Sequence, residues 1–162
     1  MTDAIQPSAL MKDPGHLLSF GFGSGLSPYA PGTMGTLVAI PLYLLVAQFG
    51  PLSVLLACVV ISLLGIYLCE RTTKALGVHD HPAIVWDEVA GYFITMLFAP
   101  VSATTVILGF ILFRIFDILK PWPISVIDSR LKGGLGVMLD DILAGVFACV
   151  ILQLVHYLGW LS

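Results

Sequence analysis

Five acidic residues in an otherwise apolar chain are the side chains best placed to do chemistry. Asp87-Glu88, Asp117 and Asp140-Asp141 make up half of the ten acidic residues, and each group stands at the edge of a long apolar stretch. A carboxylate at such an edge is costly to bury unless it meets a cation or a proton. Three groups at three such edges therefore predict one shared site that binds a hard metal ion.

The ligand types favour one class of metal. Clustered carboxylates repel one another unless a cation lies among them. Oxygen ligands without a cysteine or a clear histidine partner favour Mg²⁺, or Mn²⁺, over Zn²⁺. Mg²⁺ commonly also takes phosphate oxygens of a substrate as ligands. Basic residues suited to phosphate stand nearby in the sequence, namely Arg114, Lys120, Arg130 and Lys132. The residues alone indicate a metal-and-phosphate site.

A segment rich in glycine, serine and proline at 21–36 precedes the first apolar run. We expect its backbone N–H groups to face the phosphate, because they lie just ahead of a helix N-terminus. Its hydroxyl groups are further candidate ligands: Ser24, Ser27, Thr33 and Thr36. A flexible re-entrant turn is the alternative for this segment. The His79-Asp80-His81 triplet is interpreted as a solvated loop rather than a metal site.

The composition indicates an integral membrane protein. Of the 162 residues, 58% are hydrophobic and only 10% are charged, whereas soluble domains carry about 25% charged residues. Three runs contain no Asp, Glu, Lys or Arg, at 14–69, 89–113 and 142–162. A membrane-spanning helix needs about 20 apolar residues. The first run is long enough for two spans, and the net charge of −3 gives no sign of nucleic-acid binding.

The elements that position the acidic groups are predicted to be helices, in an all-α membrane bundle of about four to five short helices. Residues 1–20 are interpreted as a polar or interfacial leader, and 21–162 as a single domain. The apolar runs and their Gly and Pro breaks predict helices at about 33–49, 52–69, 82–98, 102–120 and 137–159, with a loop at 124–136. Small pairs follow two acidic pairs, Ala90-Gly91 and Ala144-Gly145, and would let those helices approach closely.

Two topologies are compatible with this pattern. If Ala99-Pro100 is a hairpin turn, all seven basic residues and the five carboxylates fall on one side, which the positive-inside rule makes cytoplasmic. If Ala99-Pro100 is a kink in one long span, Asp117 faces away from Glu88 across the membrane and no common site forms. We favour the hairpin.

With these residues assembled, the chain resembles the phosphatidylglycerophosphatase A family of bacterial membrane phosphatases. The matching stretches are GFGSGLSPYAPGTMGT at 21–36, WDEVAGYF at 86–93, FRIFDILKPWPI at 113–124 and GGLGVMLDDILAGVFA at 133–148. They cover most of the chain, in the order of the family. No acidic or basic motif position departs from its pattern.

The resemblance implies a Mg²⁺-dependent hydrolase of the bacterial inner membrane, and the positive-inside rule places its acidic site on the cytoplasmic side. It would convert phosphatidylglycerophosphate to phosphatidylglycerol and phosphate. We expect the five carboxylates to hold one or two ions and one of them to act as base, while Arg114 and Lys120 offset charge on the phosphoryl group. The alternative function is a small cation transporter, in which carboxylates would spread through the depth of the membrane. The oligomeric state stays open.

Overall fold

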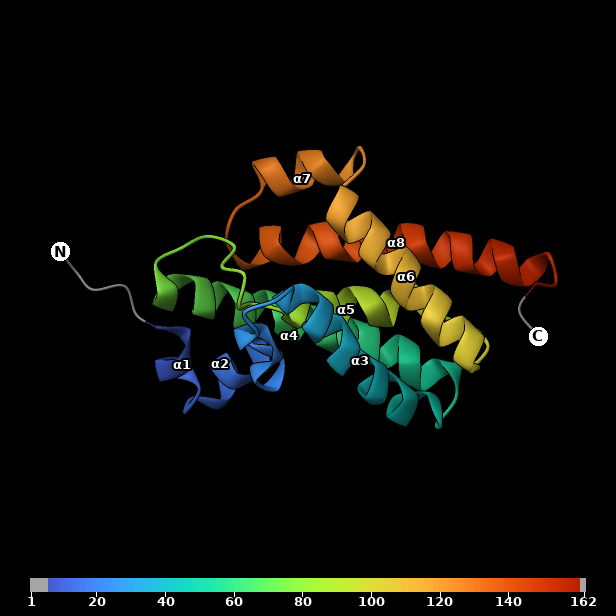
Figure 1. Cartoon of the computed structure of the whole chain (residues 1–162), viewed down its shortest axis with the longest axis horizontal. Helices are drawn as coiled ribbons and strands as arrows, with labels where there is room; N and C mark the ends of the chain where they lie inside the picture. The colour runs from blue at the N-terminus through green and yellow to red at the C-terminus, as the bar shows by residue number, and fades with distance from the viewer. Residues whose placement is uncertain (1–5, 161–162) are drawn as a thin grey trace.

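The computed structural model describes residues 6–160, and these residues form helices without any strand, which confirms the all-α expectation (Figure 1). Residues 1–5 of the expected leader and residues 161–162 lie outside this range. The helices are α1 (Pro7–Leu10), α2 (Pro14–Ser19), the 3-10 helix η1 (Gly21–Leu26), α3 (Pro31–Ala47), α4 (Pro51–Leu76), α5 (Trp86–Thr95), α6 (Ala103–Leu119), α7 (Ile124–Arg130) and α8 (Gly133–Tyr157).

The count of four to five helices is not confirmed, because the described residues form eight α-helices, five of which have ten or more residues. Two of them, α4 and α8, are long and apolar enough to cross a membrane. The apolar helix α3 is shorter, with 17 residues.

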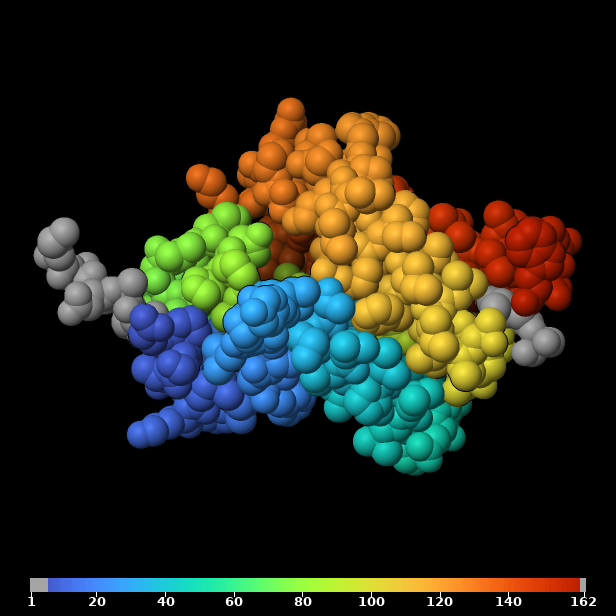
Figure 2. Space-filling model, viewed as in Figure 1, coloured from blue at the N-terminus to red at the C-terminus, as the bar shows by residue number. Residues whose placement is uncertain are grey.

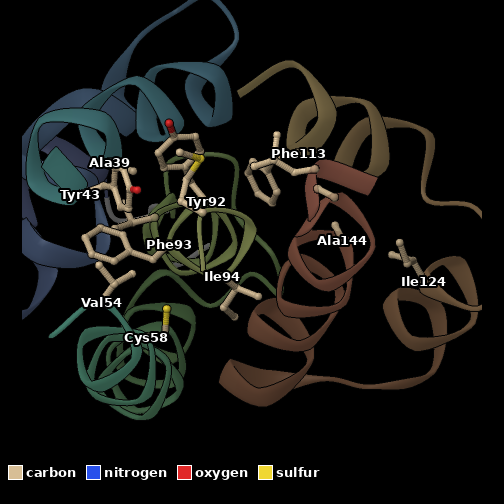
Figure 3. Packing of buried hydrophobic residues seen from close by; sticks show 14 residues of the cluster. Ala39, Tyr43, Val54, Cys58, Tyr92, Phe93, Ile94, Phe113, Ile124 and Ala144 are labelled. Carbon is tan, nitrogen blue, oxygen red and sulfur yellow. The ribbon is translucent and has the colours of Figure 1, made fainter. Parts of the chain in front are cut away.

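Helix α5 is the centre of the bundle and packs against α3, α4, α6 and α8. Every residue of α5 except Glu88 is buried. Tyr92 and Phe93 each meet the ring of Tyr43 edge to face, with centroids 6.1 and 6.0 Å apart (Figure 3). Because α5 is enclosed by other helices, its first turn is held in a fixed place, and that turn carries Asp87 and Glu88.

Helices α5 and α8 approach closely at Gly91 and Gly145. A Cβ atom at Gly145 would lie only 2.4 Å from the carbonyl oxygen of Gly91, so the contact requires a residue without a side chain. The approach follows from the two small pairs seen in the sequence. It brings the third turn of α8, with Asp141, beside the first turn of α5.

Substitution of Gly145 by valine is expected to lower the free energy of unfolding by at least 1–3 kcal/mol, the approximate cost of overpacking a core. The backbone of α5 must move to make room for the new side chain. The measurement is a denaturation midpoint in detergent, with Val146→Ile as the control, because it adds a methyl group on the half-exposed neighbouring face. Equal midpoints for both variants would show that the helices are not in close contact.

The chain reverses direction between α5 and α6, at residues 96–102 (Figure 1). As a result Glu88 at the start of α5 and Asp117 at the end of α6 both contact Arg114. The structure thus has the hairpin rather than the kink at Ala99-Pro100.

Two helix boundaries differ from the sequence-based expectation. Helix α5 begins at Trp86 rather than Pro82, because Ala83, Ile84 and Val85 are buried against the N-terminal segment and the N–H of Val85 donates to the carbonyl of Ser19 at 2.9 Å. The loop expected at 124–136 contains α7 and the first turn of α8.

The described part of the leader packs on α4. Asp13 caps α2 and forms a two-point ion pair with Arg71, and the guanidinium holds the pKa of Asp13 below its ordinary value. Farther in, the buried His16, Ser19 and Thr72 form a chain of hydrogen bonds of 2.8–2.9 Å. The leader therefore supports Val85, which directly precedes the acidic turn of α5.

Replacing Thr72 with valine is expected to destabilise the fold by about 1–3 kcal/mol, because two buried polar groups lose their shared partner. Thr73→Val is the matched control, since the buried Thr73 hydroxyl has no hydrogen-bond partner. Thermal unfolding of both variants in detergent measures the difference. If Thr73→Val is the more damaging change, the chain of hydrogen bonds does not anchor the leader.

Candidate functional site

The candidate site is a pocket of about 310 Å³ where α5, α6 and α8 meet the start of α3. Figure 2 shows a hollow here, bounded by the loop 77–85, the start of α3 and the end of α6. Six acidic side chains line it against two basic ones: Asp80, Asp87, Glu88, Asp117, Asp140 and Asp141 with Arg114 and Lys120. The excess of negative charge in a partly enclosed space favours a bound cation.

Three of the carboxylates converge most closely. Asp87, Glu88 and Asp141 can each place one oxygen within 4.8 Å of the other two. Asp87 and Asp141 are 7% and 3% exposed, so they are almost completely removed from solvent. Their close approach depends on the contact of α5 with α8 at the two glycines.

Several carboxylate oxygens in the pocket are buried and have no hydrogen-bond partner. They are Asp87 Oδ1, Glu88 Oε2, Asp140 Oδ1 and Asp141 Oδ2. Buried polar atoms in proteins are nearly always satisfied, so a group of unsatisfied carboxylate oxygens is suited to hold a cation. The donor set contains oxygen only, which fits Mg²⁺ or Mn²⁺.

Arg114 and Lys120 lie at the edge of the carboxylate cluster. Arg114 Nη1 contacts Asp117 and lies 3.9 Å from Glu88 Oε1. Lys120 Nζ lies 2.6 Å from both Asp140 Oδ2 and Asp128 Oδ1. Burial by itself lowers the pKa of Lys120, but the two carboxylates outweigh it and hold the pKa above its ordinary value. Both side chains therefore present positive charge to an anion in the pocket.

The structure does not bring the other predicted binding residues to this pocket. Thr36 is buried and donates to the carbonyl of Gly32, and Ser27 donates to the carbonyl of Tyr29. The expected hydroxyls and basic side chains that do not line it are Ser24, Ser27, Thr33, Thr36, Arg130 and Lys132. Arg130 and Lys132 are exposed on α7 and at the start of α8. The segment 21–36 meets the pocket at Ala30, Pro31 and Gly32 instead.

Gly32 is the residue of this segment that approaches the acidic cluster. A Cβ atom there would lie 2.1 Å from Glu88 Oε1 and 3.1 Å from Arg114 Nη1. Two acidic residues near the site were also missed by sequence reasoning. Asp80 lines the pocket from the loop interpreted as solvated, and Asp128 contacts Lys120. Asp128 follows Lys120 by eight residues, across a turn that contains two prolines. Helical periodicity therefore does not predict their contact.

Comparisons with known proteins give a consistent result. The family model described as phosphatidylglycerophosphatase A matches residues 17–156. The chain is 46% identical to phosphatidylglycerophosphatase A of Escherichia coli strain K12, over 99% of this chain and 95% of that protein. The phosphatidylglycerophosphatase A of Haemophilus influenzae is 45% identical, over 91% of each chain.

A third relative carries a different name. The putative phosphatidylinositol-3-phosphatase of Bacteroides thetaiotaomicron is 39% identical, over 87% of this chain and 92% of its own length. No solved structure gives a significant match.

Proposed function

The chain belongs to the phosphatidylglycerophosphatase A family, and we propose that it removes the terminal phosphate of phosphatidylglycerophosphate to give phosphatidylglycerol. One observation in the structure supports this function above the others. Buried, unsatisfied carboxylate oxygens of Asp87, Glu88 and Asp141 converge beside Arg114 and Lys120 in one pocket. Such a pocket suits a divalent cation together with a phosphate group.

Asp87, Glu88 and Asp141 would hold Mg²⁺ or Mn²⁺, and Asp117 and Asp140 border the same space. When bound, the ion would supply Lewis-acid polarisation of the phosphate oxygens and of the attacking water. Without it, a phosphate group would meet an excess of negative charge in this pocket.

The two basic side chains orient the phosphoryl group. Arg114 offers a planar pair of donors to two phosphate oxygens, and Lys120 adds a compact positive charge. Charge on the equatorial oxygens is stabilised by these side chains as the phosphoryl group transfers. They are already held in place by Asp117 and Asp140, so little reorganisation is needed when the substrate binds.

The reaction is a displacement by water. The water oxygen forms a bond to phosphorus, and the bond from phosphorus to the glycerol oxygen breaks. One of the pocket carboxylates accepts the proton from the water, and the departing alkoxide takes up a proton to become the hydroxyl of the product. No side chain forms a covalent bond to phosphorus in this scheme.

We further propose that the protein is a multi-pass protein of the bacterial inner membrane with this pocket on the cytoplasmic side. The α3–α4 turn, the α5–α6 turn and the C-terminal end of α8 lie toward the end of the bundle away from the pocket (Figure 1). Both turns fall within runs without Asp, Glu, Lys or Arg. Charge collects at the pocket end, which the positive-inside rule assigns to the cytoplasm.

The transporter alternative gains no support. The relatives are named as phosphatases, and the carboxylates meet in one pocket at one end of the bundle rather than along its length.

Release of inorganic phosphate tests the proposal directly. The purified protein in detergent is expected to release phosphate from phosphatidylglycerophosphate when Mg²⁺ is present, and much more slowly from phosphatidylinositol 3-phosphate. The second lipid is the comparison because the third relative is named for it. Faster release from the inositol lipid would assign a different substrate, and no release from either lipid would remove the proposed activity.

A further inference from the structure

We propose that the seam between α3 and α6 binds an acyl chain of the lipid substrate while its phosphate occupies the acidic pocket. This inference rests on the proposed function, since it assumes that the substrate is a phosphorylated lipid. It adds a second binding site, for the apolar part of that lipid. Figure 2 shows the blue-to-teal α3 lying along the gold α6, with the hollow of the acidic pocket at one end of their contact.

Each helix presents an exposed apolar stripe, and Leu44, Ile107 and Ile118 connect these stripes to the two pockets of the seam. On α3 the stripe contains Met34, Leu37 and Leu44, and on α6 it contains Ile107 and Ile118 with the isoleucines at 111 and 115 between them. The spacing of three, four or seven residues keeps each stripe on one face of its helix. Neither stripe includes a charged side chain, so an acyl chain would meet no polar group along it.

The two ends of the seam are both hollow, and they differ in character. At one end, Pro31 of α3 and Ile118 of α6 line the acidic pocket. At the other end, Leu44 of α3 and Ile107 of α6 line a second pocket of about 380 Å³. The side chains that complete the second pocket are Val101, Ser102, Ala103 and Val106. A charged pocket and an apolar pocket joined by one apolar seam match the two chemically different parts of a phosphorylated lipid.

The dimensions suit a lipid that stays in its own leaflet. Ile107 and Ile118 are eleven residues apart on one helix, which is about 16 Å at a rise of ~1.5 Å per residue. Half of the hydrocarbon core of a bilayer is about 15 Å deep. A chain that follows the seam from the acidic pocket would therefore reach the apolar pocket without leaving the leaflet, and the lipid would enter sideways between α3 and α6.

Filling the apolar pocket tests this inference. Ala103→Trp fills it from the exposed start of α6, and Leu44→Trp fills it from α3. Neither residue lines the acidic pocket. The control is Val59→Trp, which places the same side chain in an apolar groove on α4 away from the seam. Each variant is assayed with Mg²⁺ on a long-chain phosphatidylglycerophosphate and on its water-soluble, deacylated head group.

Both seam variants are expected to lower kcat/KM for the long-chain lipid about tenfold, because excluding even two methylene groups from an apolar site costs that much in affinity. Their kcat/KM for the soluble head group should equal that of the unmodified protein, and Val59→Trp should change neither value. Equal losses on both substrates, or no loss on the lipid, would overturn the seam as the acyl site. If the unmodified protein cleaves neither substrate, the proposed function itself fails.

Discussion

Asp87→Asn and Asp141→Asn are each expected to lower kcat for phosphate release by at least 10²–10³-fold, the approximate cost of removing one preorganised electrostatic group from an active site. Asparagine keeps the shape of aspartate but removes the charge. Each of these side chains is buried and has an oxygen without a hydrogen-bond partner. Loss of the charge therefore weakens the cation site rather than a structural contact.

The control for these variants is Asp128→Asn. Asp128 contacts Lys120 from outside the pocket, and Lys120 keeps its contact with Asp140 when Asp128 is changed. We expect only a small change in kcat. The thermal midpoints of all three variants, measured without metal, should stay close to that of the unmodified protein. Turnover near the normal rate in both Asp87→Asn and Asp141→Asn would remove these residues from the site.

Removal of divalent cations is expected to abolish phosphate release reversibly. Dialysis against EDTA should stop the reaction, and added Mg²⁺ or Mn²⁺ should restore it, because the pocket offers only oxygen ligands. A readout independent of activity is the thermal midpoint. A ligand that binds only the folded state stabilises it by about 2.7 kcal/mol at 100 times its Kd. Mg²⁺ should therefore raise the midpoint of the unmodified protein.

The same titration on Asp141→Asn separates binding at this site from a general salt effect. The midpoint of that variant should respond much less to Mg²⁺. If EDTA leaves turnover unchanged, or if both proteins gain the same stability from Mg²⁺, the carboxylates do not form the metal site.

The arrangement of the acidic groups could be predicted from the sequence because it depends on local rules. Charge-free runs mark the helices, the small pair at Gly91 and its counterpart at Gly145 permit close approach, and one turn at Ala99-Pro100 decides whether Asp117 joins Glu88. Each of these features is visible in a short window of sequence. The roles assigned to the individual carboxylates remain predictions.

The errors arise where contacts between distant segments override local signals. Pro82 is a good first residue for a helix, yet α5 begins only at Trp86. The N–H of Val85 donates to the carbonyl of Ser19 and holds the preceding residues outside the helix. Thr36 does not line the pocket, because within α3 its hydroxyl donates to the carbonyl of Gly32, four residues earlier, and its binding of phosphate stays a prediction. Asp80 reaches the pocket from a loop that meets the start of α8, where the N–H of Gly133 donates to His79 Nδ1, and no periodic pattern signals such a loop.

Gly32 gives the glycine-rich segment a role at the pocket that does not depend on the hydroxyl groups of the segment. The first turn of α3 lies so near Glu88 and Arg114 that a methyl group at position 32 would collide with the Glu88 carboxylate and press against the Arg114 guanidinium. The space between α3 and the acidic cluster is thus only large enough for the hydrogen atom of a glycine at position 32. This part of the chain contributes the absence of a side chain, which leaves room beside Glu88 and Arg114. A search of the sequence for functional groups does not find such a contribution.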